Sequence, residues 1–248
     1  MTLIQQAGAQ QAGRRRPWGK IVLIVLAGLI LSPLPFRTFL FHPFNMPSGS
    51  MTPTLQVGDM FFVAKYSYGY SHYSLPFSPN LFSGRIFGSA PERGDVVVFR
   101  SPKDDRIDFV KRVVGLPGDL VQVKQGQLYI NGTAVARERG QDFVGNDPCG
   151  SGPATATRRW RETLPNGVSY ETLDCVANGF YDNTNVYTVP PGHFFVLGDN
   201  RDNSVDSRVL SQMGYIPLEN VIGRVGLIFF SKSPSGVTRS ERIGTVVR

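Results

Sequence analysis

An uninterrupted apolar run, Ile21–Leu31, constrains this chain more than any other feature of the sequence. Together with the short segment that follows it, the run reaches about 24 Å as a helix, slightly less than the hydrocarbon core of a bilayer. Trp18, Lys20 and Arg37 flank the run and can extend toward the headgroups. We therefore expect residues 18–36 to form a single transmembrane anchor.

The residues before the apolar run determine its orientation. Arg14–Arg16 lie just ahead of it, and positive charge on such a segment keeps that segment in the cytoplasm. We expect residues 1–17 to be a cytoplasmic tail and the body of the chain to lie on the periplasmic side of the inner membrane. A cleaved secretory signal is the alternative, but Pro33 and Pro35 crowd the place where its cleavage site would follow.

The net charge of +7 does not indicate nucleic-acid binding. Four of the positive charges precede or open the anchor, namely those of Arg14, Arg15, Arg16 and Lys20. A surface that follows phosphates needs basic residues clustered in the folded body. We therefore expect the lipid bilayer, and no nucleic acid, among the partners.

Beyond the anchor, short runs of β-branched and aromatic residues alternate with turn residues. The expected strands are 60–64, 95–99, 120–123, 127–130, 194–197 and 225–230. Helices do not alternate with these strands, which disfavours a parallel doubly wound sheet. We expect a mainly β domain over residues 37–232, built of folded antiparallel sheets or barrel-like. Residues 233–248 are expected to be a basic, weakly ordered tail.

The chain has two cysteines, Cys149 and Cys175. An oxidising periplasm permits a disulfide between them, and we favour that bridge. Two unrelated buried thiols are the alternative, because the sequence alone does not bring the residues within bonding distance.

Two segments combine residues that nucleophilic catalysis uses. In the first, Pro43–Leu55, prolines stiffen the backbone on both sides of Ser48-Gly49-Ser50 and can hold a hydroxyl in a fixed pose. In the second, Asp108–Asp119, Lys111 lies in an apolar run where a strand would turn it toward the core. A buried lysine gives up its proton more readily and can then act as a base. An ordinary loop serine and a solvated edge-strand lysine are the alternatives.

The third segment, Gly198–Arg208, is dense in aspartate, asparagine, serine and arginine. This density suits a rigid hydrogen-bonded turn. A calcium loop is the alternative, but the ligand order of an EF-hand with its terminal glutamate is absent. We expect neither a metal nor a cofactor.

Together the three segments resemble bacterial type I signal peptidase, a membrane-bound enzyme that removes signal peptides from exported proteins. The most specific parts are Ser50-Met51-Thr52-Pro53, Lys111–Asp119 and Gly198–Arg208, in this order after the anchor. The resemblance implies a largely β fold with Ser50 as nucleophile and Lys111 as general base. It implies that the Ser48 hydroxyl and the Ser50 N–H form the oxyanion hole and that Ser204 orients the lysine amine. The implied supporting network consists of Arg112, Asp199, Asp206 and Arg208.

The resemblance also implies cleavage after small residues at −3 and −1, which requires two shallow apolar pockets that exclude larger side chains. By correspondence, the pockets are lined by Met46, Pro47, Met51, Leu55 and Val110. Plain core packing is the alternative for Leu55 and Val110. Side chains expected to rest on the bilayer, or else to pack in loops and core, are Phe77, Leu81, Phe82, Phe87, Phe229 and Phe230.

Three other functions compete with this interpretation. His193 and an aspartate could form a conventional triad with Ser50. A specialised relative with the same dyad would mature one dedicated substrate, such as a conjugation pilin. A catalytically silent, anchored β domain would bind exported proteins, but it would have no need of Ser50, Lys111 and Ser204 together. Better-known members of the family often have two spans, whereas one is expected here, and the stretch between Asp119 and Gly198 is comparatively short.

Overall fold

The computed structural model describes residues 18, 20–23, 28, 39–75, 77–145, 148–149 and 156–247. The chain divides into two compact units, Met1–Phe36 and Arg37–Arg248. Most of the expected anchor, 18–36, lies outside the described residues. Among the residues that are described, no helix is both long enough and apolar enough to span a membrane.

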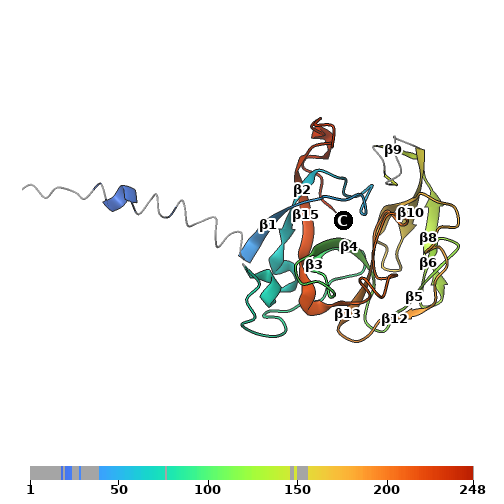
Figure 1. The fold of residues 1–248 in the computed structure, drawn as a ribbon, viewed down its shortest axis with the longest axis horizontal. Helices are drawn as coiled ribbons and strands as arrows, with labels where there is room; N and C mark the ends of the chain where they lie inside the picture. The colour runs from blue at the N-terminus through green and yellow to red at the C-terminus, as the bar shows by residue number, and fades with distance from the viewer. Residues whose placement is uncertain are drawn as a thin grey trace, which may run out of the picture. The chain divides into compact units, whose positions relative to one another are not determined.

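The second unit is built on one large antiparallel sheet. Its strands follow the order β1-β2-β15-β3-β4-β13-β14. In chain order they are β1 (Phe41–Asn45), β2 (Asp59–Ala64), β3 (Val96–Arg100), β4 (Asp108–Gly115), β13 (His193–Leu197), β14 (Ile216–Pro217) and β15 (Val221–Ser231). Figure 1 shows the long β15 running between β2 and β3. The sheet therefore brings together strands from both ends of the unit.

Two smaller antiparallel sheets follow β4 in the chain and lie on the right of Figure 1. One sheet contains β8 (Ala136–Arg139), β9 (Phe143–Val144), β10 (Ala156–Thr163) and β11 (Ser169–Asp174). The other contains β5 (Leu120–Lys124), β6 (Gln127–Ile130), β7 (Thr133–Ala134) and β12 (Tyr187–Thr188). The β5–β6 turn places Gln125 and Gly126 at φ of 49° and 74°, as the tight turns of β-hairpins require.

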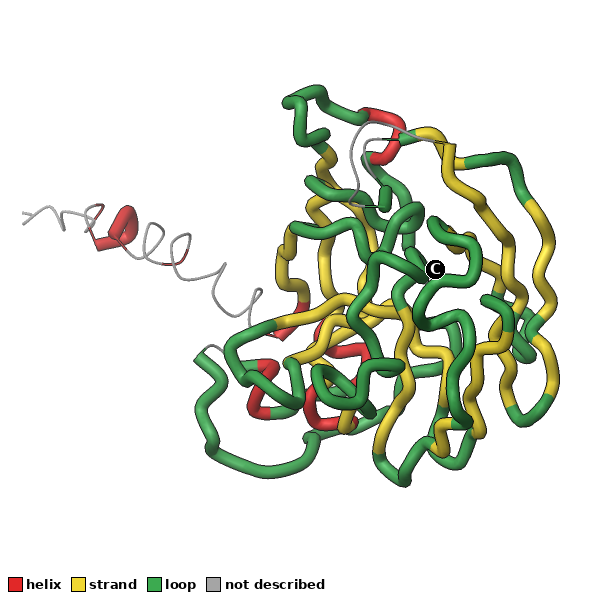
Figure 2. The backbone as a smooth tube through the Cα atoms, turned by 45° about the vertical axis from the view of Figure 1, so that its right-hand side comes forward, coloured by secondary structure: helices red, strands yellow, loops and turns green. Residues whose placement is uncertain are grey.

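The prediction of a mainly β, antiparallel fold is confirmed, and each expected run lies within a strand except for Asp95, which directly precedes β3. In Figure 2 the described part of the second unit is almost entirely strand and loop. Helical structure between residues 41 and 247 is limited there to the short 3-10 segments η2 (Lys65–Tyr68), η3 (His72–Ser74), η4 (Leu218–Asn220) and η5 (Ser240–Arg242).

Strand β4 is buried on both faces from Val110 to Gly115. Successive side chains of a strand point to opposite faces, so Lys111 and Arg112 enter different parts of the interior. Val110 belongs to a core cluster with Met46, Met51 and other apolar residues. The core therefore packs the segment around Ser50 directly against the strand that carries Lys111.

The expectation of a weakly ordered tail after residue 232 is wrong for residues 233–247. This segment turns back along β15, where Leu227 and Val246 form a β-bridge. Val247 is buried in the same core cluster as Met46 and Met51. Composition suggested a solvated basic tail, but two of its arginines bind a buried carboxylate, that of Asp59.

Candidate active site

The loop between β1 and β2, residues 46–58, carries Ser50 and is called here the Ser50 loop. Its ends are held together by backbone hydrogen bonds, from Met46 N to Asp59 O (2.8 Å) and from Gly58 N to Met46 O (2.9 Å). Inside the loop, Leu55 N donates to Met51 O over 2.9 Å. The loop is therefore closed at its base and folded on itself, which gives the serine a defined position.

Ser50 and Lys111, which are far apart in sequence, meet in the structure. Lys111 Nζ donates to Ser50 Oγ over 2.8 Å and to Val110 O over 3.0 Å. Ser50 is 7% exposed and Lys111 is 2% exposed. The structure thus brings together the two residues that the sequence suggested as nucleophile and base.

Burial lowers the pKa of Lys111 from 10.5 to about 8. The carboxylates of Asp206 and Asp199 raise this pKa, while the positive charge of Arg208 lowers it. The charge that lowers it comes from Arg208 and not from the neighbouring Arg112, which points to the opposite face of β4 and pairs with Asp199. A lysine with such a pKa is substantially neutral at mildly alkaline pH and can accept a proton.

The other two serines of the expected site differ in their contacts. Ser48 Oγ lies 3.3 Å from Ser50 Oγ, within hydrogen-bonding distance. Ser204 is buried near Ser50, but its hydroxyl makes no hydrogen bond to Lys111. A Cβ on Gly198 would clash with the Ser204 hydroxyl and would lie 2.6 Å from Ser50 O. A glycine at 198 is therefore what lets the third segment approach the Ser50 loop.

The four charged residues of the expected network form two buried ion pairs. Arg112 binds Asp199 through both its Nε (2.8 Å) and Nη2 (2.7 Å) and stacks on the Tyr170 ring, 4.1 Å from its centroid. Arg208 binds both carboxylate oxygens of Asp206 over 2.8 Å. Burial alone would raise the pKa of Asp206, but Arg208 holds it below its usual value. Both carboxylates therefore have a fixed charge partner.

Two polar residues that the sequence analysis missed join the segments. Thr54 Oγ1 donates to Asp199 Oδ2 over 2.5 Å, which connects the Ser50 loop to the Arg112 pair. Asn200 N donates to Ser50 O over 3.1 Å, and its side chain donates to Gly49 O over 3.1 Å. Both residues lay in the quoted motifs, but nothing in the sequence distinguished them from ordinary turn residues.

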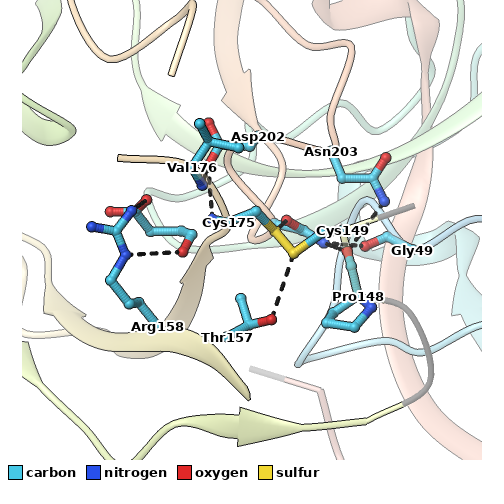
Figure 3. Close-up of a disulfide and its surroundings, with 11 residues drawn as sticks. Gly49, Pro148, Cys149, Thr157, Arg158, Cys175, Val176, Asp202 and Asn203 are labelled. Atoms are coloured by element: carbon cyan, nitrogen blue, oxygen red, sulfur yellow. Dashed lines mark hydrogen bonds and ion pairs between the residues drawn. A yellow bond between two sulfur atoms is a disulfide. The ribbon is translucent and has the colours of Figure 1, made fainter. Parts of the chain in front are cut away.

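The structure joins Cys149 and Cys175 in a disulfide, with their Cα atoms 5.8 Å apart. Figure 3 shows it close to Gly49 and Asp202. The Asp202 carboxylate accepts hydrogen bonds from the backbone N–H groups of Cys175 (2.7 Å) and Val176 (2.9 Å). Asn200 also donates to the carbonyl of Pro148, next to Cys149. The bridge thus borders the loop that supports Ser50.

The expected pocket residues fall into two groups. Met46, Met51, Leu55 and Val110 are buried in one core cluster, whereas Pro47 is exposed. The cluster includes the direct neighbours of Ser50 and Lys111 in the chain, so its residues can both pack the core and form the floor of a pocket. The structure is therefore compatible with both interpretations of these residues.

The remaining candidates lie elsewhere. His193 begins β13, where its Nδ1 lies 2.9 Å from Pro191 O, and no contact with Ser50 is found among the described residues. Phe77, Leu81 and Phe87 are strongly exposed, whereas Phe229 packs on Phe62 with ring centroids 4.4 Å apart. The exposed side chains are thus available for a bilayer, and His193 is not placed as a base for Ser50.

Comparisons with known proteins agree on one family. The family model described as signal peptidase, peptidase S26, matches residues 15–230. Signal peptidase I of Rickettsia typhi is 42% identical over 211 residues, which covers 82% of this chain and 77% of that protein. Signal peptidase I of Rickettsia conorii is 39% identical over 225 residues, covering 88% and 80%. A crystal structure of a signal peptidase I from Enterococcus faecalis matches with a TM-score of 0.32 and 28% identity, over 55% of this chain and 97% of that one. The chain therefore belongs to the signal peptidase S26 family, whose members are serine endopeptidases.

Proposed function

We propose that this chain cleaves signal peptides from exported preproteins with a Ser50–Lys111 dyad, after small residues at −3 and −1. The observation that carries the proposal is the 2.8 Å contact between Ser50 Oγ and Lys111 Nζ, two buried groups. The lowered pKa of Lys111, about 8, supports its role as general base.

In the proposed reaction, neutral Lys111 takes the proton of Ser50 as Oγ attacks the scissile carbonyl carbon. The carbonyl oxygen becomes an oxyanion, and the Ser50 N–H and Ser48 hydroxyl donate hydrogen bonds to it. As the intermediate collapses, the C–N bond breaks and Lys111 returns the proton to the leaving amine, the new N-terminus of the mature protein. In the second half, water gives a proton to Lys111 and its oxygen attacks the acyl carbon; the C–Oγ bond then breaks, and Lys111 returns the proton to Ser50 Oγ.

We infer that selectivity for small residues comes from exclusion. An added methylene changes binding by only about 1–3 kcal/mol through attraction, so a pocket rejects large residues best when there is no room for them. Met46, Met51 and Val110 belong to one packed cluster beside the dyad. Tight packing of these side chains supports shallow pockets, because the cluster cannot yield without opening the core.

The proposed location follows from the N-terminal sequence. Residues 18–36 act as a single anchor in the inner membrane, with 1–17 in the cytoplasm and the catalytic unit in the periplasm. Exposed Phe77, Leu81 and Phe87 rest on the bilayer and bring the site to a membrane-bound substrate. A reporter fused after the last residue tests this topology, and its activity in the cytoplasm would contradict it.

The decisive experiment incubates the detergent-solubilised full chain with a preprotein and sequences the N-terminus of the product. We expect one cut after the small residue at −1, and no cut with Ser50→Ala. Lys111→Arg serves as a second control, because guanidinium stays protonated at any usable pH. Substantial cleavage by Lys111→Arg, purified free of host peptidase, would refute the dyad. A panel of preproteins and pilins distinguishes a general enzyme from a dedicated one.

A further inference from the structure

The last segment of the chain lies beyond residue 230, where the family match ends. Residues 231–247, called here the C-terminal strap, are nevertheless integrated in the fold. Gly244 N donates to Ile228 O over 2.8 Å, and Ile228 N donates to Thr245 O over 2.9 Å. Val247 is 5% exposed and lies in the core cluster that contains Met46 and Met51. The strap thus runs from β15 to the core beside the Ser50 loop.

The strap surrounds a carboxylate that is completely buried. Asp59, at the start of β2, is 0% exposed. Arg242 Nε lies 3.0 and 3.1 Å from its two oxygens, and Arg239 Nη2 lies 3.3 Å from Oδ1. Ser231 Oγ donates to Oδ1 over 2.6 Å. A buried carboxylate left without such partners would be strongly unfavourable, so the strap and β2 hold each other in place.

The same two guanidinium groups also hold the Ser50 loop. Arg242 Nη2 donates to Thr54 O over 2.9 Å. Arg239 Nη2 donates to Val57 O, and its Nη1 to Gln56 Oε1, both over 2.7 Å. Each arginine therefore connects the Asp59 carboxylate to the second half of the loop.

From this half of the loop, contacts continue toward the reacting atoms. The Thr54 hydroxyl donates to Asp199, which the Arg112 side chain holds from β4. Leu55 N donates to Met51 O, next to Ser50. The loop is thus held between the strap on one side and Asp199 on the other, and loss of either support leaves Ser50 on a longer unsupported segment.

We propose that Arg239 and Arg242 are positioning residues for Ser50, acting through the backbone of the Ser50 loop. This inference rests on the proposed role of Ser50 as nucleophile. Among the described residues, the hydrogen bonds and ion pairs of the two arginines do not include Ser50 or Lys111. Their effect is on the position of Oγ relative to Lys111 Nζ. Displacement of reacting groups by about 1 Å can lower a rate by about 100-fold, so loosening the loop reduces kcat.

The test compares Arg242→Gln with a matched control, Arg85→Gln, in the full-length protein in detergent. Arg85 is also a guanidinium clamp on backbone carbonyls, donating to Tyr68 O (2.9 Å), Gly69 O (2.7 Å) and Leu218 O (2.9 Å). Its hydrogen bonds to the described residues do not reach the Ser50 loop. Both variants lose a comparable clamp, but only one loses contact with the loop.

The first measurement is the Tm of each variant. The kinetic measurements, made well below that Tm, are kcat and KM for a signal-peptide substrate and the pH dependence of kcat. We expect Arg242→Gln to lower kcat by about 10-fold or more, with the midpoint of the acidic limb unchanged because the surroundings of Lys111 are intact. Arg85→Gln should lower Tm by an amount similar to that in Arg242→Gln but keep the wild-type kcat. Arg242→Lys, which retains the charge but not the fork, should fall between wild type and Arg242→Gln.

Wild-type kcat in folded Arg242→Gln would overturn the inference and leave the strap a purely stabilising element. If Arg242→Gln does not fold, Arg242→Lys decides the matter in the same way: a wild-type kcat overturns the proposal, and a reduced one supports it. Ser50→Ala separates this result from the proposed function. Activity in Ser50→Ala would refute Ser50 as nucleophile, whereas an inactive Ser50→Ala with fully active strap variants refutes the positioning role alone.

Discussion

Replacing Lys111 by methionine is expected to abolish cleavage and, at the same time, to stabilise the folded protein at pH 7. The wild-type amine is 2% exposed, and burial lowers its pKa from 10.5 to about 8. Below pH 8 the amine is charged in both the folded and the unfolded chain, but the folded chain holds that charge in poorly hydrated surroundings. Methionine has a similar length and no charge, so this unfavourable contribution disappears.

The magnitude follows from the difference between the two pKa values, which corresponds to about 3 kcal/mol. Between pH 8 and pH 10.5 the unfolded chain retains the proton and the folded chain has released it, so wild-type stability rises with pH in this window. The variant lacks this rise. The variant also loses the two hydrogen bonds that Nζ donates to Ser50 Oγ and Val110 O. Each loss lowers the free energy of unfolding of the variant by about 1 kcal/mol. We therefore expect the free energy of unfolding of Lys111→Met to exceed that of the wild type by about 1 kcal/mol at pH 7. At high pH it should fall below the wild-type value by about 2 kcal/mol.

The assay is urea denaturation in detergent, with the disulfide intact, at several pH values from 7 to 10.5, where a solvated lysine side chain loses its proton. Lys103→Met, at an exposed lysine, controls for general effects of removing one positive charge. The decisive quantity is the difference in free energy of unfolding between Lys111→Met and the wild type, which should change by about 3 kcal/mol across this pH range. A stability difference that does not depend on pH would refute the reasoning about burial, and cleavage by Lys111→Met would refute its role as base.

Three further predictions concern the same site. The kcat/KM of the wild type should rise with pH along an acidic limb centred near 8, as Lys111 loses its proton; a limb that disappears in His193→Asn would instead assign the base to that histidine. Reduction of the Cys149–Cys175 bridge, whose partners are 26 positions apart, should lower the free energy of unfolding by about 3 kcal/mol, and alkylation of two free thiols in unreduced protein would contradict the bridge. Gly198→Ala should lower kcat with little change in KM, because its Cβ would lie 2.6 Å from Ser50 O; unchanged kinetics would show that the loops can separate without loss.

The fold class was predictable because strands leave a local record in the sequence. Apolar runs such as 120–123 and 127–130, separated by a glycine-containing turn, specify a hairpin without any knowledge of the rest of the chain. The order of strands in the large sheet was not predictable. Strand β15 lies between β2 and β3, although it is distant from both in sequence, and only long-range packing determines that choice.

The proposed reacting pair, Ser50 and Lys111, was suggested by residue type and by resemblance, but its surroundings were not. Thr54 and Asn200 each make a side-chain hydrogen bond to a residue more than 140 positions away, Thr54 to Asp199 and Asn200 to Gly49 O. No local pattern encodes such a partner. The prediction for the strap was wrong for a similar reason. In the sequence Arg239 and Arg242 resemble solvated surface charges, and only the fold brings them to the buried carboxylate of Asp59.

The difference between the neighbours Lys111 and Arg112 shows how the fold divides electrostatic roles along one strand. Both are almost fully buried, yet Arg112 has a bidentate carboxylate partner of its own, and Lys111 has none in the hydrogen bonds that it makes to Ser50 and Val110. The nearby carboxylate of Asp206 raises the lysine pKa, but Arg208 binds both its oxygens and itself lowers that pKa. An unpaired Asp206 would instead keep Lys111 protonated and unable to accept the serine proton. In the proposed dyad, the role of the two ion pairs is therefore to neutralise the acids around Lys111, so that burial determines the charge of the lysine.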